Sequence, residues 1–432
     1  MRPGTGGGTF LLAAIAGTAI ANNYTLQPAL TTVAADLDVP LSVIGLVPTA
    51  ALVGCMTGFA FLLPLADHLA PNRLVAVQLT ALTAALVLAA VAPGAAVLLA
   101  AYLAIGAAAG VAAQAGTIAG RHAPPGRGGR SVATVAAGMS AGILLSRMVG
   151  GTLTDLLGWR RMLIVFAVLA LLGAIAAAAL LPRRRPTSRL GYRATLASLF
   201  PLLRRHPPLR SAVATGGLWY FAFNLTWVAL GLALAQPPRS LAPTDIGLYS
   251  LAGLLGFAVL PLTGRLVDRY GSPAVITAAV LAAAAGVALL ATGLDTPPVV
   301  AAGLALFDAG CFAAQAANQS RVIALDPARS GSLSSVYLVL YFTIGAIGTA
   351  LAAPVLHTLG WRGVTLIACV ALLLAAALGR RARGSGAEDG GRARRAPAAM
   401  SVTTRNVEAI DRQHGENDAW AHVSQRTDTP QN

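Results

Sequence analysis

The chain has 432 residues, of which 56% are hydrophobic and only 11% are charged. Soluble domains carry about 25% charged residues, so this composition excludes a set of ordinary soluble domains. The formal net charge is +15. Because the arginines lie between apolar segments, we attribute this charge to orientation in a membrane and expect no nucleic-acid partner.

Apolar stretches long enough to cross a bilayer recur along most of the chain. A hydrocarbon core of about 30 Å needs about 20 apolar residues per helix. We therefore predict an all-α membrane protein with twelve transmembrane helices, at residues 9–30, 43–66, 74–92, 95–118, 132–154, 161–181, 210–236, 244–267, 273–292, 297–320, 331–356 and 361–379.

The chain repeats itself at a spacing of about 201 residues. Asn23-Tyr24-Thr25-Leu26 is echoed by Asn224-Leu225-Thr226-Trp227, and Leu157-Gly158-Trp159-Arg160 recurs as Leu359-Gly360-Trp361-Arg362. Matches in the same order at nearly one offset indicate a duplicated unit. We expect two pseudo-symmetric lobes of six helices each, an organisation typical of secondary transporters.

The repeat and the arginine distribution together predict the domains and their orientation. We expect an N-terminal lobe at 1–181, a cytoplasmic linker at 182–209, a C-terminal lobe at 210–379 and a disordered cytoplasmic tail at 380–432. With both termini cytoplasmic, the outer loops hold few arginines, as the positive-inside rule requires. These outer residues are Arg160, Arg161, Arg239 and Arg362.

One inner loop carries a recognisable motif, Gly264-Arg265-Leu266-Val267-Asp268-Arg269-Tyr270-Gly271. It resembles the signature loop Gly-x-Leu-Ala-Asp-Arg-x-Gly of the major facilitator superfamily. The resemblance covers residues 9 to 379. It implies that Asp268, with Arg269 and the glycines, forms a latch that holds one arrangement of the lobes.

The first lobe holds an eroded copy of this loop, Leu63-Pro64-Leu65-Ala66-Asp67-His68-Leu69-Ala70-Pro71-Asn72-Arg73. Only Leu65, Ala66, Asp67 and the distal Arg73 survive from the motif. The resemblance assigns a gating role to Asp67 and Arg73 as well. The alternative is that both loops are plain orientation signals.

The segment Gly138-Met139-Ser140-Ala141-Gly142-Ile143-Leu144-Leu145-Ser146-Arg147 is similar to the antiporter motif of the same family. Its ending in Arg147 resembles a branch of efflux permeases, which favours export. Helix packing through Gly138 and Gly142 is the alternative explanation for the glycines.

Two charges fall inside predicted membrane helices, where charge is expensive and usually functional. Arg147 lies in the segment 132–154, and Asp308 lies in the segment 297–320. We expect Arg147 to bind anionic or dipolar groups and to take part with Asp308 in proton coupling, in which Asp308 carries the proton. A structural role, as polar ties between helices, is the alternative for both.

Polar residues also recur at equivalent positions of the two halves, and the resemblance implies that the helices carrying them line a central cavity. Interhelical hydrogen bonding is the alternative. With Arg147 and Asp308, the expected substrate-binding residues are Asn23, Gln27, Gln114, Tyr220, Asn224, Trp227, Gln315 and Asn318.

We therefore expect a secondary active transporter in the cell membrane that couples efflux of a small metabolite or drug to protons by alternating access. Proton-coupled uptake of a sugar, amino acid or organic acid is the first alternative, and a non-transporting receptor or scaffold is the second. No phosphate-binding loop, enzyme site, metal site or cofactor site is found, and a monomer is expected.

Overall fold

The computed structural model describes residues 6–123, 128–183, 201, 203–204, 206–325 and 330–395. Across these residues the chain forms helices joined by short turns, and it contains no β-strand. The chain divides into two compact units, Met1–Ala382 and Arg383–Asn432. All contacts discussed below lie within the first unit, and most of the predicted linker lies outside the described residues.

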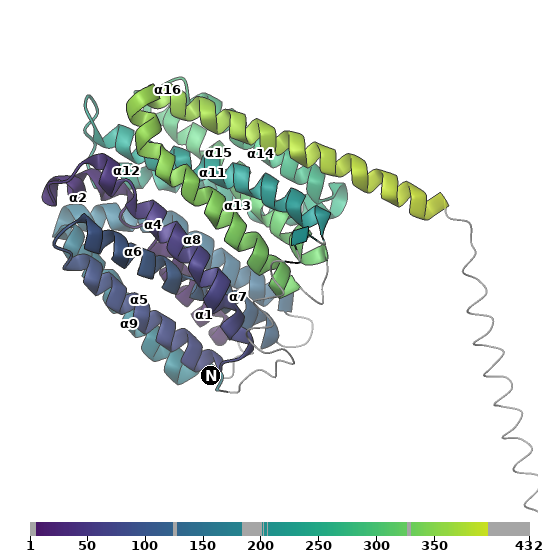
Figure 1. Cartoon of the computed structure of the whole chain (residues 1–432), viewed down its shortest axis with the longest axis horizontal. Helices are drawn as coiled ribbons and strands as arrows, with labels where there is room; N and C mark the ends of the chain where they lie inside the picture. Colours follow the sequence, from purple (N-terminus) through teal and green to yellow (C-terminus); the bar gives the residue numbers. More distant parts are fainter. Residues whose placement is uncertain are drawn as a thin grey trace, which may run out of the picture. The chain divides into compact units, whose positions relative to one another are not determined.

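Helices of the two halves form two groups within this unit, coloured purple to blue and teal to yellow-green in Figure 1. The first group contains α1 (Gly6–Ala21), η1 (Gln27–Ala29), α2 (Leu30–Asp36), α3 (Leu41–Ile44), α4 (Val47–Thr57), η2 (Gly58–Leu62), η3 (Leu63–Asp67), α5 (Pro71–Ala90), α6 (Ala95–Ala109), α7 (Val111–Arg121), α8 (Gly128–Leu157) and α9 (Trp159–Leu180). The second contains α11 (Pro207–Ala235), α12 (Pro243–Leu248), η4 (Tyr249–Gly253), α13 (Leu254–Tyr270), α14 (Ser272–Leu290), α15 (Pro297–Leu325) and α16 (Ser330–Arg395).

The predicted all-α membrane fold is confirmed. Nine helices of the described part are long and apolar enough to cross a membrane. The predicted segments 331–356 and 361–379 share α16, in which Gly360 has a non-helical backbone (φ 64°). Because the segments 9–30 and 244–267 are also divided into shorter helices, the count of twelve spans stays a prediction.

The first predicted membrane segment is interrupted in its middle. Helix α1 ends at Ala21, and a turn precedes η1 and α2. Pro28 has no backbone N–H to donate to the Tyr24 carbonyl oxygen four residues earlier. This oxygen instead accepts a hydrogen bond from the Gln27 amide, only three residues away in sequence (3.1 Å). At the equivalent position of the second half stands Ala229, and α11 continues without interruption.

Glycines bring pairs of helices into backbone contact. A Cβ atom on Gly106 of α6 would overlap the carbonyl oxygen of Ala51 in α4, and one on Gly54 would overlap that of Leu103. Similarly, a Cβ on Gly138 of α8 would lie 2.5 Å from the Ala13 oxygen of α1. Helix packing was the alternative explanation for Gly138 in the sequence, and the structure places this glycine in contact with α1.

The repeated Leu-Gly-Trp-Arg motif forms the same sharp turn in both halves. Gly158 and Gly360 have positive φ angles of 84° and 64°, which favour glycine. Each turn is followed by a tryptophan that donates a hydrogen bond. Trp159 is buried and donates to Asp36, and Trp361 donates to the Leu290 carbonyl oxygen.

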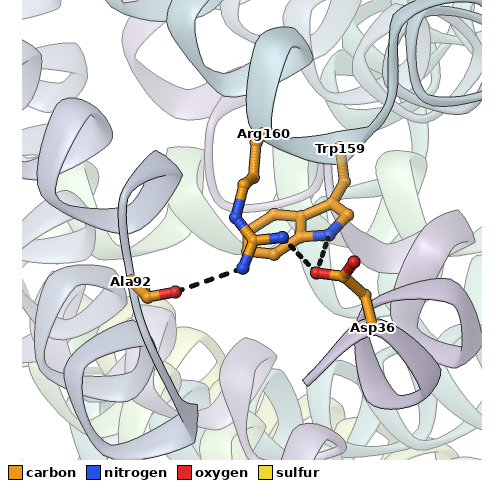
Figure 2. Close-up of polar contacts among 4 residues, drawn as sticks. All are labelled: Asp36, Ala92, Trp159 and Arg160. Carbon is orange, nitrogen blue, oxygen red and sulfur yellow. Dashed lines mark hydrogen bonds and ion pairs between the residues drawn. The ribbon is translucent and has the colours of Figure 1, made fainter. Parts of the chain in front are cut away.

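A polar cluster ties three loops together at this end of the molecule (Figure 2). Asp36, at the end of α2, accepts hydrogen bonds from Arg160 and from the Trp159 indole (3.2 Å). Arg160 also donates to the Ala92 carbonyl oxygen after α5 (3.3 Å). The hydrogen bond from Arg160 holds the pKa of the Asp36 carboxyl below its usual range.

We expect Asp36→Asn to lower the thermal unfolding midpoint slightly at neutral pH, since this ion pair is partly exposed. Because the folded pKa is depressed, the stabilisation is present above the unfolded value of about 4 and is lost as pH falls through the folded value. The difference from the unmodified protein should therefore vanish on acidification, measured by unfolding at several pH values. Asp38→Asn, two residues away, is the control, and an equal effect there would contradict the assignment.

Candidate functional site

Arg147 lies in α8 with its side chain only 2% exposed. Its Nε donates a hydrogen bond to Oε1 of Gln27, just beyond the interruption of the first segment (3.0 Å). Its guanidinium carbon lies 4.3 Å from the ring centre of Trp227 and 4.9 Å from that of Tyr24. These aromatic faces stabilise the cation without accepting its hydrogen bonds.

Asp308 lies in α15 and is fully buried. Its Oδ1 accepts a hydrogen bond from the Trp227 indole nitrogen (2.9 Å). A Cβ atom on Gly253 would overlap Oδ2 and would lie 2.6 Å from Cδ2 of Leu144. The carboxylate therefore packs against the backbone at the end of η4, where only glycine leaves enough room.

Trp227 brings these two buried charges together, since its ring faces Arg147 and its indole nitrogen binds Asp308. No ion pair within 4.0 Å joins the two charges in the described part of the chain. Nη1 and Nη2 of Arg147 and Oδ2 of Asp308 are buried without a hydrogen-bond partner. A native protein rarely leaves such groups unsatisfied, which makes Arg147 and Asp308 the candidates for a ligand site.

Aromatic side chains from both halves surround this pair of charges. The Tyr24 and Tyr220 hydroxyls form a hydrogen bond across the two halves (3.2 Å). The Tyr220 ring stacks on Tyr341, with ring centres 3.9 Å apart. The predicted residues Gln27, Tyr220 and Trp227 are thus brought together with Arg147 and Asp308, while Tyr24 and Tyr341 were not predicted. Tyr24 stands in the repeated Asn-Tyr-Thr-Leu motif, which could have identified it.

The paired asparagines lie near this cluster but make bonds within their own halves. Asn23 donates to Sγ of Cys55 (3.1 Å), and its Oδ1 is buried without a partner. Asn224 donates to the Tyr220 carbonyl oxygen, one turn earlier in α11 (2.8 Å). Both residues therefore stabilise the helices that carry the cluster.

The paired glutamines and Asn318 are held in separate networks. Gln114 donates to the Leu62 carbonyl oxygen (2.7 Å) and accepts a bond from Gln78. Gln315 accepts a bond from the Tyr337 hydroxyl (3.0 Å). Asn318 donates to that hydroxyl and to the Ala212 carbonyl oxygen. These bonds link helices within one half, and none of them reaches Arg147 or Asp308.

The loop residues with expected gating roles lie at the opposite end of the helices from Asp155. Gly264, Asp268 and Arg269 are exposed, and the Asp268 carboxylate has no ion-pair partner among the residues that the structure describes. Gly271 has φ 80° and ends α13. Arg73 is exposed, and the Asp67 side chain lies outside the described residues.

The two halves make close polar contact at the Asp155 end. Oδ2 of Asp155 in α8 accepts bonds from the Thr244 amide (2.7 Å) and hydroxyl (2.5 Å) at the start of α12. Gly247 follows Thr244 by about one turn of α12, and a Cβ added there would lie 2.5 Å from the Arg147 carbonyl oxygen of α8. These contacts, which sequence analysis missed, involve ordinary polar and small residues at positions far apart in the chain.

Comparison with known sequences identifies relatives over most of the chain. The family model described as Major Facilitator Superfamily matches residues 11–349. The chain is 34% identical to the probable transporter SCO4007 of Streptomyces coelicolor, over 84% of this chain and 85% of that protein. It is 30% identical to the uncharacterized transporter YgaY of Escherichia coli O157:H7, over 84% and 93% of the two chains.

Comparison with solved structures shows the same fold at low sequence identity. The nucleoside transporter NupG superposes with a TM-score of 0.70 at 14% identity, over 87% of this chain and 98% of that chain. The human organic anion transporter MFSD10 superposes with a TM-score of 0.64 at 20% identity, over 86% and 98% of the two chains. In the described residues, no group of three His, Cys, Asp or Glu side chains could hold a metal ion.

Proposed function

The chain belongs to the Major Facilitator Superfamily and is a secondary transporter, and from that premise we propose that it exports a small polar or amphipathic compound in exchange for protons. The observation that carries this proposal is the buried pair Arg147 and Asp308, each with unsatisfied atoms. Charges inside a membrane bundle mark substrate or ion pathways.

Asp308 is our candidate for the proton carrier. Burying a carboxylate without full pairing costs free energy, so a proton on its free Oδ2 stabilises the closed arrangement seen here. When the site opens, water or substrate replaces the proton. A group that holds a proton in one arrangement and releases it in the other couples proton movement to the change of shape.

Alternating access requires contacts that form at one end and break at the other. Hydrogen bonds join the two halves. One links the Tyr24 and Tyr220 hydroxyls, and another runs from the Thr244 amide to the Asp155 carboxylate. The Asp268 loop, at the opposite end, is exposed. We propose that the structure represents the state closed at the Asp155 end, with the Asp268 latch released, and that both lobes rock about the buried charges.

We expect Asp308→Asn to reduce proton-driven transport at least tenfold, because asparagine cannot release a proton. The measurement uses vesicles that contain purified protein and a pH-sensitive dye. A pH gradient is imposed, and the dye reports proton movement when compounds selected by thermal-shift screening are added. Substrate exchange without a gradient should continue at substrate concentrations high enough to compensate for weaker binding, since exchange requires no release of a proton. Undiminished gradient-driven flux would remove Asp308 as the carrier. Asp295→Asn, at an exposed carboxylate paired with Arg239, is the matched control.

Uptake by the same machinery is the alternative direction of transport, and flux in oriented vesicles distinguishes the two. The solved relatives named above handle nucleosides and organic anions, so the shared fold does not select a substrate. A receptor or scaffold role would depend on the polar tail. Deleting the residues after Arg380 should therefore leave flux intact if the protein is a transporter.

A further inference from the structure

The free atoms of Arg147 define one half of a candidate recognition site. A guanidinium group carries five N–H donors in a planar fork, and only Nε is used here. Nη1 and Nη2 are buried and have no acceptor. This fork matches the two oxygens of a carboxylate, which can accept both bonds at once.

The free oxygen of Asp308 defines the other half. Oδ1 is occupied by the Trp227 indole, whereas Oδ2 is buried without a donor. When the site opens and Asp308 releases its proton, the ionised Oδ2 only accepts hydrogen bonds, so the group that completes it must donate. A protonated amine supplies both the donor and the opposite charge.

The position of Trp227 explains why the two protein charges do not satisfy each other. Its ring stacks on Arg147 and its indole nitrogen holds Asp308, so one side chain keeps both groups in place. The Arg147 guanidinium is further restrained by Gln27 and the Tyr24 ring. Two preorganised charges of opposite sign, each with free atoms, fit a ligand that carries both signs.

One segment, residues 243–253, packs against both residues. Gly247 packs against the Arg147 backbone, and Gly253 packs against Oδ2 of Asp308. Between them, the Ser250 hydroxyl donates to the Leu144 carbonyl oxygen of α8 (2.8 Å). Movement of this segment away from α8 therefore opens the region beside both residues at the same time, which would let one ligand reach both.

From this geometry we infer that the site takes a small zwitterion of the amino-acid type. Its carboxylate binds Nη1 and Nη2 of Arg147, and its ammonium group binds Oδ2 of Asp308. The ring of Trp227 lies between the two positions and packs against the connecting atoms. The inference names the substrate class of the proposed transport site, and it rests on that proposal for the claim that the bound compound is transported.

The test uses the full-length protein purified in detergent. The probes are the proteinogenic L-amino acids, each with the amine that lacks its carboxylate and the acid that lacks its amino group. We expect at least one amino acid to raise the unfolding midpoint, since a ligand that binds the folded state stabilises it. Both singly charged counterparts should bind about 10- to 100-fold more weakly, because each leaves one protein charge unpaired.

Two variants assign each end of the ligand. In Asp308→Asn, the amino acid and its acid counterpart should bind equally weakly, because the ammonium group has lost its partner. In Arg147→Gln, the amino acid and its amine counterpart should bind equally weakly. Arg160→Gln and Asp295→Asn, at partly or largely exposed charges, should leave the discrimination unchanged.

The result that would overturn the inference is a singly charged acid or amine that binds as tightly as its amino acid, or a panel in which no amino acid shifts the midpoint. Vesicle flux separates this inference from the transport proposal. Flux of a singly charged compound would keep the transporter and reject the zwitterion site. Binding of an amino acid without any flux, under either direction of pH gradient, would keep the site and reject the transport proposal.

Discussion

Replacing Arg147 with glutamine should make the protein more stable and unable to transport. The buried guanidinium has two nitrogens without acceptors, and such a charge costs free energy in the folded state. Glutamine is neutral and can still reach Gln27. We expect a net gain of a few degrees in the unfolding midpoint, because the desolvation cost of the incompletely bonded guanidinium is only partly offset by its cation–π contacts, worth about 0.5–2 kcal/mol each.

The same substitution should lower substrate affinity about 100-fold or more, because two charge-assisted hydrogen bonds are lost at once. The measurements are thermal unfolding of purified protein and flux in vesicles. Arg160→Gln is the control, since Arg160 is partly exposed and pairs with Asp36. If Arg147 were only a structural tie between helices, its replacement would lower the midpoint and leave the affinity unchanged.

Replacing Gly106 with alanine should destabilise the first half of the molecule by about 1–3 kcal/mol. The added methyl group would overlap the Ala51 carbonyl oxygen and would lie 2.9 Å from the Cys55 amide nitrogen. These are backbone atoms of α4, which cannot rotate away as a side chain can. The two helices must therefore separate, and the reciprocal contact of Gly54 with Leu103 is weakened as well.

Gly116 supplies a matched control in the neighbouring helix α7, because a Cβ atom added there would have no neighbouring atom within 4 Å. Gly116→Ala should be neutral or stabilise the protein by about 0.5–1 kcal/mol, as alanine favours helices over glycine. Thermal unfolding followed by tryptophan fluorescence would compare the two variants. Equal midpoints would show that the α4–α6 contact tolerates an extra methyl group and would contradict the packing described here.

Some features of the site could be predicted because they depend on one segment at a time. Arg147 and Asp308 stand out in the sequence because an ionised group within an apolar stretch is unusual. The glycine turns at Gly158 and Gly360 follow from a repeated motif. Other features could not, because an amide side chain forms similar bonds in a cavity and between helices. Gln114, which bonds the Leu62 carbonyl oxygen, illustrates this ambiguity.

By itself the sequence determined the all-helical membrane fold, the internal repeat and the presence of one buried charge in each half. These follow from hydrophobicity along single segments and from similarity at a fixed offset. Only the tertiary structure decided that Arg147 and Asp308 face the same Trp227 without pairing, that the first segment is interrupted after Ala21, and that residues 243–253 pack against the Arg147 backbone and the Asp308 carboxylate. Such contacts join residues far apart in the chain, and their free energy depends on packing geometry that no local pattern contains.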